Sequence, residues 1–211
     1  MDYSAALNAD DRNEADAVEQ RSAPRYTSLI RAAKIVCGQG EFLCVIRDVS
    51  ATGISFRSFH ALPDDTNLAL ELQNGESYEI TEVRREGFEA SYRFEKPVEV
   101  EKLIHETWNF PKRQLRLNLA IPLTISTLSG KAEATTVNLS QQGARVECDA
   151  AFAIDQRLIV TGEGLSETRA TVRWRRDAEF GLVFDNTLSL REFAMLAAAV
   201  QCPAMLRDQP I

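Results

Sequence analysis

The chain has 211 residues, of which 45% are hydrophobic and 26% are charged, and its formal net charge is −7. This balance is typical of a soluble globular protein and excludes a wholly disordered chain or a collagen-like fibre. The longest apolar runs, such as residues 42–46, are far shorter than the roughly 20 residues that cross a bilayer, so no membrane insertion is expected. The acidic balance also argues against a protein that coats nucleic acid.

The acidic excess is concentrated at the start of the chain. Residues 1–20 contain six acidic side chains and one basic side chain, Arg12, and so carry five of the seven net negative charges. Residues 1–18 also contain few large apolar side chains, and we expect them to form a disordered acidic tail. The N-terminus has neither the basic start nor the apolar core of a secretion signal, which predicts a cytoplasmic protein.

Two polar motifs follow the tail. Arg21 and Arg25 form an R-x-x-x-R pair, and Asp48, Ser50 and Gly53 form D-x-S-x-x-G. The guanidinium groups are planar, permanently charged forks that suit phosphates and the O6/N7 edge of guanine. The carboxylate can accept hydrogen bonds from the donor side of guanine, and the hydroxyl can donate or accept. The glycine permits a positive φ or a close backbone approach to a ligand. Together these residues predict a site for an anionic ligand that carries guanine.

Each motif alone has a plainer explanation. Isolated surface arginines are usually solvated, and R-x-x-x-R pairs arise by chance at ordinary arginine usage. D-x-S-x-x-G can be an ordinary turn in which Asp48 and Ser50 bond to nearby backbone N–H groups and Gly53 closes the loop. The order of the two motifs, one before and one after a first predicted strand, favours the ligand site.

Both halves of the chain have the alternating pattern of short antiparallel strands. Apolar and polar side chains alternate over residues 42–47 and 68–72 in the first half, and over residues 119–125 and 170–175 in the second. Glycine-containing turns separate these runs, which is typical of half-buried strands. Five or six strands in each half predict a small closed β-barrel, because closure removes exposed edges.

Two stretches depart from the strand pattern. The apolar spacing from Val98 to Trp108 predicts a short helix between the halves. Ser189 and Glu192 have the spacing of a capping box, and they precede an apolar run over 193–200 that predicts a final helix. The expected fold class is therefore all-β with short helices: two antiparallel β-barrels, each followed by a helix.

An internal repeat relates the two halves at a separation of about 90 residues. Residues 21–25 correspond to 112–116, residues 48–53 to 138–143, and residues 92–94 to 182–184. The separation hardly changes among the three pairs, so chance does not explain it. We predict homologous domains at 19–96 and 112–203, joined by a linker at 97–111 and followed by a tail at 204–211.

The paired motifs resemble the signature of PilZ domains, the bacterial receptors for cyclic di-GMP, which is R-x-x-x-R followed further along by [D/N]-x-S-x-x-G. The resemblance covers residues 21–96 and again 112–186. It implies a six-stranded barrel with a C-terminal helix, cyclic di-GMP as the ligand, no other cofactor and no catalysis. By this resemblance Arg21 and Arg25 would clamp phosphates and guanine faces, while Asp48, Ser50 and Gly53 would hold one guanine on the barrel surface.

The second copy departs from this pattern. Its corresponding residues are Lys112, Arg113, Arg116, Asn138, Ser140 and Gly143. A lysine in the first position is a point charge without a bidentate fork, and an asparagine in place of aspartate loses the charge that strengthens a guanine contact. The sequence therefore predicts that the first domain binds the ligand and that the second binds weakly or serves as an interaction module.

Neither a metal site nor a catalytic centre is expected. The four cysteines, Cys37, Cys44, Cys148 and Cys202, lack the spacing of a zinc site and are interpreted as reduced, buried thiols. The two histidines, His60 and His105, complete no metal set with them and are expected at the surface. No nucleophile–base pair stands out.

Our first hypothesis is a cytoplasmic cyclic di-GMP receptor or adaptor that converts ligand binding into an altered contact with an unidentified protein partner. The alternative is an interaction module that keeps the same fold without binding nucleotide. A third possibility, an enzyme, has no constellation of residues to support it.

Five further side chains receive an interpretation from the strand pattern. Trp174 alternates with polar residues and is expected in the core rather than as a stacking platform. Arg31, Lys34 and Arg47 project from predicted strands and are expected to be ordinary exposed charges. Arg57 follows the first motif, but its counterpart in the repeat is Glu147, so it is left outside the predicted site.

Overall fold

The computed structural model describes residues 26–65, 68–104 and 114–207 of the chain. The predicted acidic tail at 1–18 lies outside these residues. The elements in chain order are β1 (Tyr26–Cys37), β2 (Gly40–Val49), β3 (Gly53–Ser58), β4 (Leu68–Glu71), β5 (Ser77–Glu86), β6 (Glu89–Phe94), α2 (Val100–Ile104), β7 (Arg116–Leu117), β8 (Pro122–Thr127), β9 (Gly130–Ser140), β10 (Gly143–Glu147), β11 (Arg157–Gly162), β12 (Leu165–Arg176), β13 (Glu179–Phe184), α3 (Leu190–Gln201) and a 3₁₀ turn, η1 (Pro203–Leu206).

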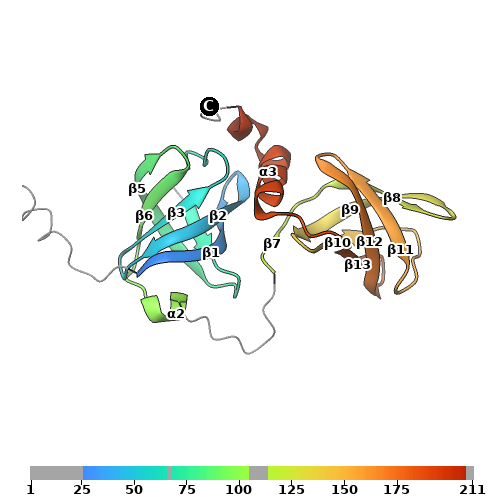
Figure 1. The fold of residues 1–211 in the computed structure, drawn as a ribbon, viewed down its shortest axis with the longest axis horizontal. Coiled ribbons are helices and arrows are strands. Elements are labelled where there is room, and N and C mark those ends of the chain that lie inside the picture. Colours follow the sequence, from blue (N-terminus) through green and yellow to red (C-terminus); the bar gives the residue numbers. More distant parts are fainter. Residues whose placement is uncertain (1–25, 66–67, 105–113, 208–211) are drawn as a thin grey trace, which may run out of the picture.

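The first six strands form a closed antiparallel barrel (Figure 1) in the order β1-β2-β3-β6-β5-β4, and β4 pairs back onto β1. Every strand has a neighbour on both sides, so no edge is left to pair with another chain. Ile54 and Phe56 of β3 point into the barrel, and Phe56 stacks on Tyr92 with ring centroids 4.7 Å apart.

Short helix α2 closes the first barrel on one side. Leu103 of this helix is buried in the core of the first barrel. Arg31 donates hydrogen bonds to the carbonyl oxygens of Leu103 (2.5 Å) and Ile104 (3.3 Å), which satisfies acceptors that a helix end leaves free. The expectation that Arg31 is an exposed charge is therefore wrong. The predicted linker helix begins later, at Val100, and residues 105–113 lie outside the described part.

The second barrel repeats the arrangement of the first. Strands β9-β10-β13-β12-β11-β8 form a six-membered ring that the β8–β9 pairing closes, and β7 adds to β9. The prediction of two six-stranded antiparallel barrels is confirmed. Final helix α3 has the predicted capping box: Glu192 N–H donates to Ser189 Oγ (3.2 Å), and Ser189 N–H donates to the Glu192 carboxylate (2.8 Å). The chain continues through η1, where Met205 is buried.

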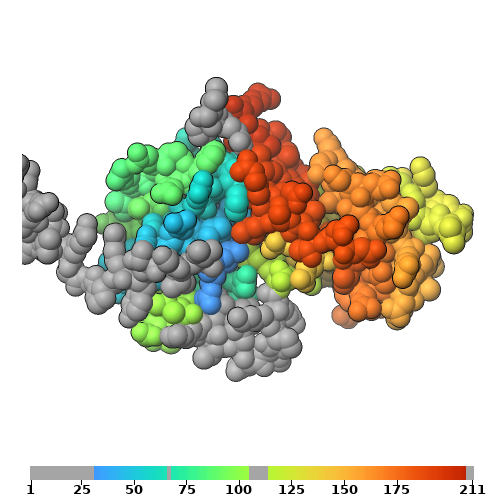
Figure 2. Space-filling model, viewed as in Figure 1, coloured from blue at the N-terminus to red at the C-terminus, as the bar shows by residue number. Residues whose placement is uncertain are grey.

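Helix α3 lies between the two barrels (Figure 1), and the space-filling view shows it filling the gap between the first barrel and the strands of the second (Figure 2). Leu43, on β2 of the first barrel, is fully buried in the same apolar cluster as Phe193, Ala194 and Leu196 of α3. Burial of this shared apolar surface stabilises the contact between the barrels. It also explains why residues 42–44 are all buried although a barrel strand should alternate.

Hydrogen bonds at Glu41, beside α3, connect the two barrels; we name this cluster of Glu41, Gln201, Asn118 and Lys34 the Glu41 junction. The backbone N–H and C=O of Glu41 bond to the side-chain amide of Gln201 at 2.7 and 2.6 Å. Its carboxylate accepts hydrogen bonds from the backbone N–H and the Nδ2 of Asn118, at 2.8 and 2.7 Å. Lys34 Nζ lies 3.2 Å from Glu41 and 3.1 Å from Glu71. Because Lys34 is only 5% exposed, the expectation that it is a solvated charge is wrong.

All four cysteines are free thiols, and Cys44 and Cys148 are buried, but Cys37 and Cys202 are partly exposed, so the expectation of burial is wrong for these two. Burial raises the pKa of the Cys44 thiol far above its ordinary value. In the part of the chain that the structure describes, no three histidine, cysteine or acidic side chains gather in the arrangement of a metal site. No helix within the described ranges is long and apolar enough to cross a membrane.

Candidate functional site: two motif hairpins and an interdomain cleft

The first motif forms the turn between β2 and β3. Ser50 N–H donates to the carbonyl of Gly53 at 2.8 Å, and Gly53 N–H donates to Ser50 Oγ at 3.1 Å. The Ser50 hydroxyl in turn bonds to the Gly53 carbonyl at 3.2 Å. Ser50 is 8% exposed and has its hydrogen bonds inside the turn, so its role is to hold the shape of the hairpin.

Each motif glycine lies so close to the neighbouring strand that a larger residue would clash with its backbone. Gly53 does not have a positive φ, and neither does Gly143. A Cβ atom on Gly53 would lie 3.2 Å from the carbonyl oxygen of Tyr92, and one on Gly143 would lie 2.0 Å from that of Leu182. The close approach that the sequence predicted therefore exists, but the partner is the backbone of the adjacent strand.

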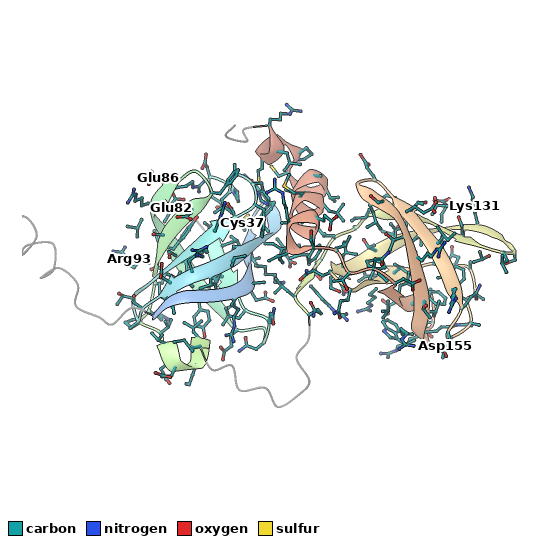
Figure 3. All side chains as sticks on the ribbon, in the orientation of Figure 1. Cys37, Glu82, Glu86, Arg93, Lys131 and Asp155 are labelled. Atoms are coloured by element: carbon teal, nitrogen blue, oxygen red, sulfur yellow. The ribbon has the colours of Figure 1, made fainter. Side chains whose placement is uncertain are left out.

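The first hairpin borders a shallow hollow of about 260 Å³ on the outside of the barrel. Asp48 is partly exposed there and accepts a hydrogen bond from Ser55 Oγ at 3.0 Å. Arg93 lies across the hollow, because it pairs with Gly53 in the β3–β6 register, and Figure 3 shows it at the end of the barrel where the chain enters β1. Arg21 and Arg25 lie outside the described residues.

Arg93 was missed by the sequence reasoning. The sequence feature that could have indicated it is its place in the repeated segment 92–94, because the equivalent residue of the second copy is Val183. A charge present only in the copy with the intact motif is the kind of difference that a ligand site produces, and pairing of β3 with β6 brings it beside the motif.

The second hairpin repeats the bond from the motif serine hydroxyl to the glycine carbonyl. Ser140 Oγ donates to the carbonyl of Gly143 at 3.1 Å, and Ser140 is 6% exposed. Here the arginine half of the motif is also described: Arg116 of β7 pairs with Ser140 of β9, and its Nη1 lies 3.4 Å from Asn138 Oδ1. The fold thus brings the two halves of the second motif together. Lys112 and Arg113 lie outside the described residues.

The second hairpin opens onto a cleft of about 770 Å³ between the barrels. One wall comes from the first barrel, with Lys34, Glu71, Leu72 and Gln73. The other wall comes from the second barrel and includes Arg116, Asn138, Gly143, Arg145, Arg173 and Trp174. The volume is within the range of roughly 300–1,000 Å³ that is usual for small-molecule sites, whereas the first hollow is below it.

Trp174 lies at this cleft and is 39% exposed, so the expectation that it belongs to the core is wrong. A β-bulge between Val172 and Trp174 shifts the pairing of β12 with β13 and ends the alternation that the sequence suggested. The indole packs against Gly181, where a Cβ atom would lie 1.9 Å from Nε1. A glycine is therefore needed beneath the ring, and the partly exposed indole lines the ligand-sized space.

Most of the positive charge at the cleft is paired. Its lining contains four cations, of which Lys34 pairs with Glu41 and Glu71, Arg145 with Glu179 and Arg173 with Asp155, whereas Arg116 forms no ion pair with a described residue. Arg145 forms an ion pair with Glu179, yet its Nε is buried and has no hydrogen-bond partner among the described residues. A buried donor without a partner is costly.

The fold and these sites define a class: a tandem of small β-barrels that display a polar motif hairpin on their outer surface, with a larger cleft between the barrels. The family model for the PilZ domain matches the chain twice, over residues 19–98 and 111–201. The chain belongs to the PilZ family and carries two copies of the domain, as the repeat predicted.

Solved structures that are similar to the chain come from several bacteria. The PlzA protein of Borreliella burgdorferi, solved in complex with c-di-GMP, is 12% identical with a TM-score of 0.33; the match covers 90% of this chain and 99% of that one. The inhibitor of motility MotI/DgrA of Bacillus subtilis is 13% identical with a TM-score of 0.37, over 83% and 97%. YcgR of Escherichia coli, also in complex with c-di-GMP, is 9% identical with a TM-score of 0.29, over 79% and 81%. No curated protein matches the chain by sequence.

Proposed function

We propose that this protein is a cyclic di-GMP receptor whose ligand binds against the motif hairpins and thereby changes its contact with a protein partner. The observation that carries the proposal is the contact between Arg116 and Asn138, which unites the two halves of the family motif beside a cleft of about 770 Å³. A ligand in this cleft would touch both barrels. Binding would then favour one arrangement of the two domains over others.

The groups around the cleft have the chemistry that this ligand needs. Arg116 offers a fork for a phosphate or for the O6/N7 edge of guanine. Asn138 offers an amide for the base, and the partly exposed indole of Trp174 offers a face for stacking.

The first hairpin is the second candidate position for the ligand. Asp48 keeps the full charge that Asn138 lacks, and Arg93 lies beside it. Arg21 and Arg25 precede β1, whose first residue, Tyr26, pairs with Val49 next to Asp48. These arginines would supply the phosphate contacts and enlarge the hollow of about 260 Å³. The intact motif favours this copy, and the assembled geometry of the cleft favours the other.

Titration calorimetry with cyclic di-GMP tests the function and distinguishes the two positions. Loss of one charge-assisted arginine contact costs about 1.5–3 kcal/mol, or roughly 10- to 150-fold in affinity. We expect Arg25→Ala or Arg116→Ala to lose binding to this extent, according to which copy holds the ligand. Arg157→Ala is the matched control, because that exposed arginine lies on β11 of the second barrel and lines neither site.

The alternative is an interaction module that does not bind nucleotide. No detectable binding by the wild-type protein at tens of micromolar ligand would support that alternative and end the proposal. Wild-type affinity in the double variant Arg25→Ala, Arg116→Ala would refute the assignment of both sites.

A further inference from the structure

A third hollow of the molecule contains three arginines and no acidic residue. It is a groove of about 370 Å³ between the outer face of the β2–β3 hairpin and the start of α3. We name it the arginine groove: its charged residues are Arg47, Arg57 and Arg191, and the half-buried rings of Phe59 and Phe88 also line it. Arg47 and Arg57 come from the first barrel and Arg191 from α3 of the second domain.

The three guanidinium groups are not paired with acidic side chains in the described structure. None of them forms an ion pair or a hydrogen bond with a described residue, and all three are exposed. Glu89 faces Arg57 in the β3–β6 register and offsets part of its charge without forming an ion pair, and Glu192 bonds to Ser189 in the capping box. Three positive charges over aromatic rings suit an acidic segment that also carries small apolar side chains.

The chain itself contains such a segment close by. Residues 10–19, which we name the acidic segment, contain five carboxylates and the apolar residues Ala15, Ala17 and Val18. Strand β1 begins at Tyr26, which pairs with Val49, and Arg47 lies two residues further along β2. At 3.3 Å per residue that separation is about 7 Å.

The connection is also long enough to permit docking. Residue 19 is seven residues from Tyr26, so an extended chain reaches up to about 23 Å. A short tether of this kind gives an effective concentration in the millimolar range, at which even weak contacts are populated.

We propose that the acidic segment docks in the arginine groove of the same molecule. The consequence for the ligand rests on the proposed function: docked carboxylates would lie within a Debye length, about 10 Å at 0.1 M salt, of the Asp48 hairpin and would disfavour an anionic ligand there. The segment is thus an intramolecular competitor that sets the ligand concentration at which the first motif is occupied.

The test of docking needs no nucleotide. In the full-length protein, ¹H–¹⁵N NMR signals of residues 10–19 are compared between the wild type and the variant Arg47→Ala, Arg57→Ala, Arg191→Ala. We expect this variant and 0.5 M NaCl to move the signals in the same direction, toward undocked positions. The matched control replaces three exposed arginines of the second barrel, Arg157, Arg169 and Arg176, and leaves the signals unchanged. Unchanged barrel signals show that each variant is folded.

Two results would overturn the proposal: segment signals that are the same in the wild type and the groove variant, or shifts that depend on protein concentration, which would indicate docking into a second copy. A separate calorimetric titration tests the consequence. Neutralising the acidic segment (Asp10→Asn, Asp11→Asn, Glu14→Gln, Asp16→Asn, Glu19→Gln) is expected to tighten cyclic di-GMP binding about 2- to 10-fold, the effect of a few screened charges. If no ligand binds at all, the proposed function fails while the NMR result still decides the docking.

Discussion

Removal of the Glu41 side chain is expected to weaken the contact between the two barrels and to lower the free energy of unfolding. Glu41→Ala deletes the acceptor of two Asn118 hydrogen bonds and one of the two carboxylates that face Lys34. The side chains of Glu41 and Lys34 are 14% and 7% exposed, so the groups left behind are poorly hydrated. Breaking a buried ion pair costs about 3–5 kcal/mol. Because Lys34 keeps Glu71, at 3.1 Å, we expect the lower end of that range, about 3 kcal/mol.

Urea unfolding followed by circular dichroism measures this loss. With an m-value of roughly 2 kcal/mol/M, a loss of about 3 kcal/mol lowers the midpoint by about 1.5 M. We also expect the transition to broaden or split, because the contact between the barrels then depends, among the described residues, on the packing of α3 and the Gln201 bonds to the backbone. Glu41→Gln, which retains one acceptor oxygen, should fall between the wild type and Glu41→Ala.

The matched control is Glu163→Ala, because Glu163 is exposed in a hairpin turn and forms no ion pair or hydrogen bond with a described residue. The reasoning would be refuted if Glu41→Ala and Glu163→Ala had the same midpoint and the same slope. The junction would then contribute nothing to the coupling of the domains, in spite of its short distances.

Two further predictions follow from the packing and protonation of single residues. Gly143→Ala places a Cβ 2.0 Å from the Leu182 carbonyl oxygen, so it should lower the free energy of unfolding, measured by thermal unfolding, by about 1–3 kcal/mol. Gly53→Ala places a Cβ 3.2 Å from the Tyr92 carbonyl oxygen and should lower it by less. Equal losses would contradict the packing argument. His60 is fully buried, so the expectation that it lies at the surface is wrong. Burial lowers its pKa, and the unfolded chain therefore binds a proton more readily than the folded one. The free energy of unfolding should therefore fall as the pH drops through about 6.5, the pKa of histidine in the unfolded chain. His60→Asn should weaken this pH dependence in melting curves between pH 7.5 and 5.5. An equally steep dependence in the variant would assign the effect to other groups.

The sequence was sufficient for the parts of the structure that depend on local or repeated pattern. Alternation of apolar residues and the constant repeat separation led to two barrels, because strand pairing within each repeat needs no information from the other. The capping box of Ser189 and Glu192 marked the start of α3, since its bonds are local. The turn role of Ser50 was among the alternatives for the same reason.

The remaining features arise where one domain meets the other or where a strand departs from regular pairing. Lys34 is an exposed charge by pattern, but the Glu41 junction buries it, and nothing near residue 34 in the chain predicts that contact. Trp174 is a core residue by pattern, but a bulge displaces it to the surface, and a bulge depends on the partner strand. The interdomain cleft likewise combines side chains more than 100 residues apart, such as Lys34 and Trp174. Periodicity reports which face of a strand is apolar, and only the packed molecule determines what that face meets.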